Sequence, residues 1–220
     1  MRASYGEGFK APTLFQLLSN YGNDKLRPEI SRGFDAGIEM GDRNAPLHFA
    51  ATLFRRDSDD LIDFVSCASL GVCATRPFGT YDNVKTARAE GFELEGDVRP
   101  TGTLTFRAAY TYVKATNRAT GKDLARRPRH ALSLSGDWTT PLAEIALGAD
   151  LRLVSDSFDD AGNFTRMDGF ALVTLRASVP LGDKFEVYGR IENVGDVKYQ
   201  TVATYGTAGR SAFVGVRAKF

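Results

Sequence analysis

The sequence predicts an all-β fold: the antiparallel wall of a transmembrane β-barrel, built from about ten strands. Three observations predict this fold. Apolar and polar residues alternate over many segments of the chain, the connections between those segments are long and short in rotation, and the polar positions carry charges of both signs.

Alternation is clear in the last segment of the chain. Ala212, Val214 and Val216 fall on one face of an extended strand there, and Arg217 and Lys219 fall on the other. Because successive side chains of a strand point to opposite faces, such a strand has one apolar side and one polar side. The same pattern recurs at 91–98, 103–112, 144–153, 170–179 and 185–192.

The connections between the predicted strands sort by length. Strands are expected at 1–7, 30–40, 46–64, 82–98, 103–115, 129–139, 143–155, 168–179, 184–193 and 210–220. The links at 41–46, 99–102, 140–142 and 180–183 are short and rich in Gly and Pro, and those at 8–29, 65–81, 116–128, 156–167 and 194–209 are long. Outer-membrane barrels have short periplasmic turns and long outer loops, whereas a Greek-key sandwich has no reason to sort its loops in this way. All the long links are therefore expected at one end of the sheet.

Charges on the polar face favour a barrel over a soluble sandwich. In a dry sandwich core each charge would cost several kcal/mol, but in a barrel lumen it stays solvated or pairs with another charge. Near 55–57 and 88–90 charges occur on both faces, which indicates either bulges or positions above the bilayer. The charges assigned to the lumen include Glu95, Arg107, Asp150, Arg176 and Arg190.

Composition excludes other classes of protein. The formal net charge is +1 with the two signs interspersed, so no basic face for nucleic acid is expected. No stretch of 18 consecutive apolar residues predicts a transmembrane helix, and barrel strands escape that search because they alternate. Neither a basic nor an apolar leader region follows Met1, so we expect either that a signal peptide and upstream domains have been removed or that the reading frame is incomplete.

Aromatic residues are expected to mark the membrane boundaries. Trp138, Phe185 and Phe220 fall on the apolar face beside short turns, and Tyr110 and Tyr112 fall toward the opposite rim. Because the first and last of the predicted strands lack outer neighbours, we expect a curled wall with two open edges rather than a closed barrel.

The two cysteines, Cys67 and Cys73, lie in a Ser, Ala and Gly-rich segment that is predicted to be a loop. An oxidising compartment would let them form a disulfide that closes a small loop. Two unpaired loop thiols are the alternative, because spacing alone fixes no geometry.

A self-contained outer-membrane enzyme is the catalytic alternative for a wall of about ten strands. Such an enzyme needs a His near a carboxylate or a Ser at the outer rim. His48 follows a short turn, remote from that rim, and His130 enters a strand from a long loop. A lone His at a rim is more often a surface residue, so no catalytic residue is expected. A soluble adhesion or binding module is a further alternative, and it would stay in the aqueous fraction without detergent.

Two runs of acidic residues suggest calcium binding at first sight. They are Asp57, Asp59 and Asp60, and Asp159 with Asp160. Neither run has the regularly spaced ligands of a calcium loop, so we interpret them as solvated loop acids. No metal site and no cofactor is expected, because glycine-rich phosphate loops and His or Cys metal motifs are absent from the sequence.

Several segments carry a family resemblance. The opening run extends from Arg2 to Leu18, and the closing run from Ile191-Glu-Asn-Val-Gly-Asp-Val-Lys-Tyr199 through Gly209-Arg210 to Phe220. Between them lie Leu26-Arg-Pro-Glu29 with Glu39, and Asp60-Leu-Ile-Asp63. In this order and spacing they resemble the C-terminal part of a TonB-dependent outer-membrane receptor. Within that family, Asn20-Tyr-Gly-Asn23, Leu124-Ala-Arg-Arg-Pro128 and Tyr205-Gly-Thr-Ala-Gly-Arg210 look most like the vitamin B12 (cobalamin) receptor branch, with a siderophore-iron receptor as the rival.

The resemblance implies a barrel of about 22 strands with an N-terminal plug domain, which imports a scarce small-molecule ligand with energy delivered by TonB. Residues 1–220 correspond to the C-terminal portion of that barrel, without the plug or the TonB box. The implied location is the outer membrane of a Gram-negative bacterium. The implied partners are outer-membrane lipid, TonB through the missing N-terminal region, and the barrel-assembly machinery through the strand that ends at Phe220.

The resemblance also implies where the ligand binds. Tyr205 stands where the cobalamin branch places a loop tyrosine that faces the ligand, and Asn20 and Tyr21 lie in a comparable loop. Plain loop packing is the alternative for each of the three. An extracellular site must be built from the long links in any case.

Overall fold

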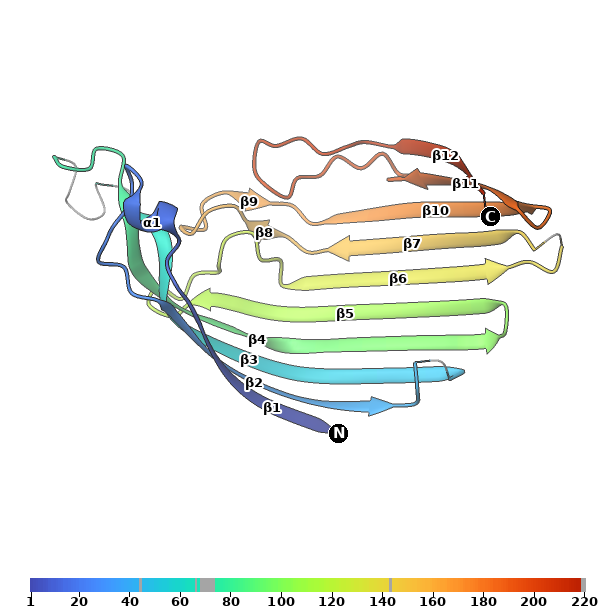
Figure 1. Ribbon diagram of the computed structural model, residues 1–220, viewed down its shortest axis with the longest axis horizontal. Helices are drawn as coiled ribbons and strands as arrows, with labels where there is room; N and C mark the ends of the chain where they lie inside the picture. Colours follow the sequence, from blue (N-terminus) through green and yellow to red (C-terminus); the bar gives the residue numbers. More distant parts are fainter. Residues whose placement is uncertain (44, 66, 68–73, 143, 219–220) are drawn as a thin grey trace.

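Ten strands form one continuous antiparallel sheet in the computed structural model, which describes residues 1–43, 45–65, 67, 74–142 and 144–218. The strand order is β1-β2-β3-β4-β5-β6-β7-β10-β11-β12, so each strand lies beside its neighbour in sequence within this sheet (Figure 1). β8 and β9 form a separate two-stranded sheet within one long link. No helix in the described part of the chain is long and apolar enough to cross a membrane.

The strand bounds follow the predicted segments to within a few residues. The longest strands are β3 and β4, and the single helix among the described elements, α1, lies in the first long link. The elements are β1 (Arg2–Lys10), α1 (Leu14–Leu18), β2 (Glu29–Met40), β3 (Leu47–Val65), β4 (Thr80–Thr101), β5 (Leu104–Asn117), β6 (His130–Thr139), β7 (Ala146–Val154), β8 (Ser157–Phe158), β9 (Arg166–Met167), β10 (Phe170–Leu181), β11 (Phe185–Glu192) and β12 (Ser211–Ala218).

The long and short connections separate as predicted. The links after β1, β3, β5, β7 and β11 lie at one end of the sheet, and the short turns lie at the other (Figure 1). We call these the loop end and the turn end. This separation confirms the topology expected for a barrel wall.

The register gives the sheet one apolar face and one charged face. Phe106, Gly136, Ala149, Leu175 and Ile191 are successive cross-strand partners from β5 to β11, and residues paired in this way share a face. The next row along the strands lies on the opposite face and contains Asp137, Gly148, Arg176 and Arg190. We call the apolar side the outer face and the charged side the inner face. The lumenal assignment of Glu95, Arg107, Asp150, Arg176 and Arg190 agrees with this register.

The bulges predicted near 55–57 and 88–90 are wrong, because Arg55 to Asp57 pair in regular register with Arg88 to Glu90. The irregularities lie instead between Ser58 and Ile62 and between Val98 and Thr101. β3 and β4 have 19 and 22 residues, about twice the 9–11 that a membrane strand needs. The outward charges therefore sit where these strands extend past the apolar band.

Gly41 shows how a short turn constrains the sequence. Its φ of +79° lies in the left-handed region. A Cβ built at Gly41 would lie 2.2 Å from the carbonyl oxygen of Leu47. Only glycine meets both conditions without strain, so the turn between β2 and β3 depends on it.

Both edges of the sheet are open in the described residues. β1 pairs with β2 alone and β12 with β11 alone, so no ladder joins Arg2–Gly6 to Ala212–Ala218. This confirms the curled wall with free edges. Trp138 and Phe185 lie beside short turns on the outer face, as predicted, and Phe220 lies outside the described residues.

Candidate functional site

The first long link folds back onto the ends of β3 and β4. The Thr80 hydroxyl donates to the Tyr21 carbonyl oxygen (2.9 Å), and the Asn23 amide donates to the Tyr81 carbonyl oxygen (3.1 Å). Arg27 makes two hydrogen bonds to the carboxylate of Asp60, at 2.5 and 3.2 Å. Arg27 and Asp60, one residue from each of two motifs, thus hold this loop against the strand ends.

Aromatic rings gather where this loop meets the strand ends. Tyr21 contacts Phe64 and Phe78 edge to face, with ring centroids 5.8 and 6.3 Å apart. Phe64 contacts Tyr81 at 5.6 Å, and Phe15 of α1 contacts Tyr81 at 6.2 Å. Tyr21 is therefore tied into loop packing while part of its ring stays exposed, and its neighbour Asn20 is exposed.

A second cluster joins three other long links. Arg126 Nε donates to Asp159 Oδ1 (2.7 Å), and the backbone N–H of Ala203 donates to the same oxygen (3.1 Å). The hydrogen bond to Asp159 raises the pKa of the Arg126 guanidinium. The exposed Tyr205 follows two residues after Ala203 in the same link. One carboxylate thus connects the links after β5, β7 and β11.

The charge on Asp159 is stabilised by these contacts. The Arg126 hydrogen bond, and then the Ala203 N–H, hold the pKa of the Asp159 carboxyl below its usual range. A group with a lowered folded-state pKa stabilises the fold above its unfolded value, about 3.9, and loses this effect as the pH falls through the folded value. The contacts of Asp159 should therefore stay intact at neutral pH and weaken in acid.

We expect Asp159→Asn to loosen the last long link at neutral pH, because the amide removes the charge that Arg126 and Ala203 stabilise. Hydrogen–deuterium exchange in peptides from 194–209 should become several-fold faster. Asp160→Asn is the matched control, since Asp160 accepts from the backbone N–H groups of Phe164 and Thr165 within its own turn. Equal exchange in 194–209 for both variants would contradict this role of Asp159.

The three predicted ligand residues do not form one group. Arg126 and the N–H of Ala203, two residues before Tyr205, bind the same oxygen of Asp159, which joins the links that carry two of the motifs that suggested the cobalamin branch. Among the described residues, no hydrogen bond or ring contact joins Tyr205 to Asn20 or Tyr21. Cys73 lies outside the described residues, so its disulfide with Cys67 stays a prediction.

The remaining sequence candidates have structural contacts. Asp57 pairs with Arg88 at 2.7 Å, and Asp60 pairs with Arg27. His130 Nδ1 lies 2.7 Å from the Tyr110 hydroxyl, and its ring also lies against Tyr112. No carboxylate or serine side chain lies within hydrogen-bond distance of the His130 ring in the described part of the chain.

His48 lies beside a short turn, as predicted, but its contacts were not predicted. Its side chain is fully buried on the inner face near the turn end. Nε2 lies 3.0 Å from Glu39 Oε1, and Nδ1 lies 3.1 Å from Asp97 Oδ2. A neutral imidazole donates from only one nitrogen, so this geometry requires one additional proton, on the ring or on a carboxyl group. His48 thereby connects β2, β3 and β4.

The same row of side chains continues across the inner face. Asp97 pairs with Arg107 at 3.5 Å, and Arg107 Nη1 donates to Asp137 Oδ2 at 2.8 Å. Asp137 and Asp150 both pair with Arg176, at 3.0 and 2.8 Å. We call the row from Glu39 through His48, Asp97, Arg107, Asp137 and Arg176 to Asp150 the inner-face row.

The sheet, with one apolar face and one charged face, is the wall of a β-barrel. It defines the class of outer-membrane barrel proteins. Residues 1–194 match the family described as TonB dependent receptor-like, beta-barrel. The chain belongs to this family of TonB-dependent receptors, whose members are transporters of Gram-negative outer membranes.

Solved structures show the same fold. The copper transporter OprC superposes with a TM-score of 0.81 at 18% identity, over 99% of this chain and 37% of that one. A mutant of the ferric enterobactin receptor PfeA from Pseudomonas aeruginosa gives 0.80 at 22% identity, over 99% and 38%. The ferric-catecholate import receptor Fiu from Escherichia coli K12 gives 0.76 at 19% identity, over 99% and 32%. The chain therefore spans about a third of the length of each of these structures.

Proposed function

We propose that this chain forms part of the barrel of a TonB-dependent transporter that captures a scarce ligand at its loop end. The observation that carries the proposal is the junction at Asp159, where three long links meet two residues before the exposed Tyr205. A rigid junction that presents an aromatic ring in the loops of a barrel suits ligand capture. TonB would act through the plug-bearing part of the receptor, and the assembly machinery through the last strand.

The ligand is proposed to be cobalamin, because the segments around Arg126 and Tyr205 both resemble the cobalamin branch and Asp159 joins the links that carry them. A ferric siderophore is the second candidate, since PfeA and Fiu are named for ferric enterobactin and ferric catecholates. Binding of cyanocobalamin and of ferric enterobactin to the complete receptor, measured by isothermal titration, separates the two. Saturable binding of neither ligand would count against both.

Tyr205→Ala should weaken binding of the ligand by about 1–2 kcal/mol, or roughly tenfold, if the exposed ring stacks on it. The measurement is the Kd of the complete receptor. Tyr5→Ala is the control, because Tyr5 is similarly exposed but lies in β1, away from the last long link. An unchanged Kd for Tyr205→Ala would remove the ring from the site without affecting the assignment of the family.

A further inference from the structure

A hollow of about 610 Å³ lies on the inner face, where β4, β5, β6, β7 and β10 run side by side. Ala109 of β5 pairs with Ser133 of β6, and Ser133 also pairs with Arg152 of β7. In the next row toward the turn end, Arg107 pairs with Ser135. The hollow therefore has a floor of short side chains between two long basic ones.

The arginines around the hollow differ in their partners. Arg107 donates a hydrogen bond to Asp137 at 2.8 Å. Arg43 lies 3.3 Å from a carboxylate oxygen of Glu95. In the part of the chain that the structure describes, the Arg152 guanidinium has no carboxylate within 4.0 Å and no hydrogen-bond acceptor. Arg152 is thus a cation of the hollow whose donors are all free.

Hydroxyl groups lie around this free guanidinium. Ser133, Ser135 and Thr174 line the hollow, and their hydroxyls have no hydrogen-bond partner among the described residues. Each hydroxyl can donate one hydrogen bond, and a guanidinium can donate five. Strands β6, β7 and β10 therefore present donors to an acceptor that the described chain does not supply.

The acids that line the hollow are bound to other side chains. Asp150 accepts two hydrogen bonds from Arg176, at 2.8 and 3.1 Å. Asp97 lies 3.1 Å from Nδ1 of His48. An anion in the hollow would therefore meet a free guanidinium and hydroxyls beside carboxylates that have their own partners. Charge-assisted hydrogen bonds from a guanidinium to an oxyanion are about twice as strong as neutral ones.

The hollow lies next to the loop end of the wall. Arg152 pairs with Leu172, and the next row of β10 toward the loop end contains Phe170. The Phe170 ring lies 4.5 Å from the ring of Tyr199 in the last long link, which also carries Tyr205. Two residues of a strand span about 7 Å, so this link packs one row above Arg152. A ligand that leaves the loop end along the inner face meets the Arg152 row of the hollow first.

We propose that the hollow binds an oxyanion group of the imported ligand as the ligand passes from the loop end into the barrel. The proposal rests on the proposed function, because it requires a ligand that is captured at the loops. It narrows that function to ligands with oxyanion groups, such as the phosphodiester of cobalamin or the catecholate oxygens of ferric enterobactin. A volume of about 610 Å³ suits a small molecule, since such sites measure roughly 300–1,000 Å³, and exceeds what one acidic side chain of a plug domain would fill.

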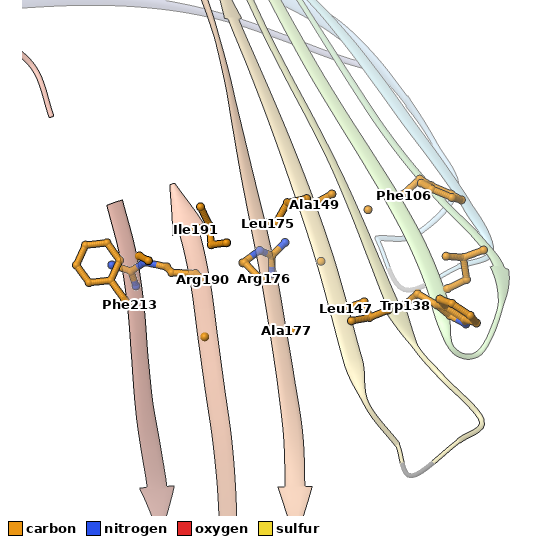
Figure 2. Close-up of a pocket in the computed structure, with 15 residues that line it drawn as sticks. Phe106, Trp138, Leu147, Ala149, Leu175, Arg176, Ala177, Arg190, Ile191 and Phe213 are labelled. Carbon is orange, nitrogen blue, oxygen red and sulfur yellow. The ribbon is translucent and has the colours of Figure 1, made fainter. Parts of the chain in front are cut away.

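Arg152→Gln in the complete receptor tests the site with inorganic phosphate as the probe. Phosphorus NMR in detergent should show weak, saturable binding to the wild type and binding about tenfold or more weaker to the variant. Arg152→Lys keeps the charge and should recover part of the affinity. Arg190→Gln is the matched control on the inner face, because Arg190 pairs with Glu192 at 2.7 Å and lies over the Phe213 ring (Figure 2). The control should bind phosphate as the wild type does.

Uptake separates this proposal from ligand capture at the loops. In cells that carry the complete receptor, Arg152→Gln should slow the uptake of cyanocobalamin or ferric enterobactin several-fold. The same variant should leave the Kd of that ligand at the loop end unchanged, and Arg190→Gln should change neither quantity. If the wild-type receptor binds neither ligand, the proposed function fails, and the phosphate titration still decides whether the hollow binds an oxyanion.

Three results would overturn the proposal. One is equal phosphate binding by the wild type and Arg152→Gln, including the absence of binding in both. Another is wild-type uptake by Arg152→Gln. The third is a thermal unfolding midpoint that falls in Arg152→Gln but not in Arg190→Gln, because Arg152 would then be bound to an acidic side chain of the plug domain.

Discussion

Replacing His48 by Ala should lower the thermal unfolding midpoint of the receptor by roughly 5–10 °C. The substitution leaves Glu39 and Asp97 facing each other across a cavity, without the group that now bonds to both. Loss of circular dichroism on heating, in detergent, measures the effect. His130→Ala is the control, because that exposed ring bonds only to the Tyr110 hydroxyl among the described side chains.

A double variant tests whether repulsion between the carboxylates of Glu39 and Asp97 lowers the unfolding midpoint of His48→Ala. Asp97→Asn in the His48→Ala background removes one of the two facing carboxylates and should recover part of the lost midpoint, so the two changes are not additive. If the effects of the two substitutions instead simply add, the midpoint of the double variant lies below that of His48→Ala by the full effect of Asp97→Asn alone. In that case charge repulsion does not explain the loss of stability in His48→Ala. A midpoint for His48→Ala equal to that of His130→Ala would show that the buried contacts contribute little.

Gly41→Ala should destabilise the fold by about 1–3 kcal/mol, because the new side chain meets a left-handed backbone and a carbonyl oxygen together. Denaturation in urea gives the free energy of unfolding. Gly102→Ala is a closely matched control in the turn between β4 and β5, where a Cβ has no neighbour within 4 Å. We expect a change within about 0.5 kcal/mol there. Equal losses of unfolding free energy at both positions would show that neither the positive φ nor the clash at Gly41 causes the destabilisation.

Strand positions and faces follow from the sequence because both depend on local period. Alternation places Phe106 and Arg107 on opposite faces whatever the neighbouring strand is, and the short turns fix which strands pair. The helix α1 was missed, although Thr13 and Gln16 have the spacing of a capping box, which the structure contains. The hairpin of β8 and β9 was missed as well, since two residues per strand carry no period.

The contacts of the candidate site depend on partners distant in sequence. Asp159 and Asp160 are identical neighbours in the sequence, yet one bridges two other links and the other closes its own turn. The sequence places His48 beside a short turn, and the structure confirms this position. Nothing local indicates that Glu39 and Asp97 lie on either side of it.

The inner-face row also bears on how the wall is assembled. A slip of one residue in the pairing of β4 with β5 would turn Asp97 and its whole set of neighbours toward hydrocarbon, since side chains alternate strictly. Turning a charge toward hydrocarbon costs up to about 2–4 kcal/mol for Arg or Lys at the bilayer midplane and less toward the interfaces. Misregistered hairpins would also lose the pairing of Asp97 with Arg107 and of Arg107 with Asp137. The correct register therefore gains the ion pairs that join β4 to β5 and β5 to β6, so the inner-face row favours the correct alignment of these strands.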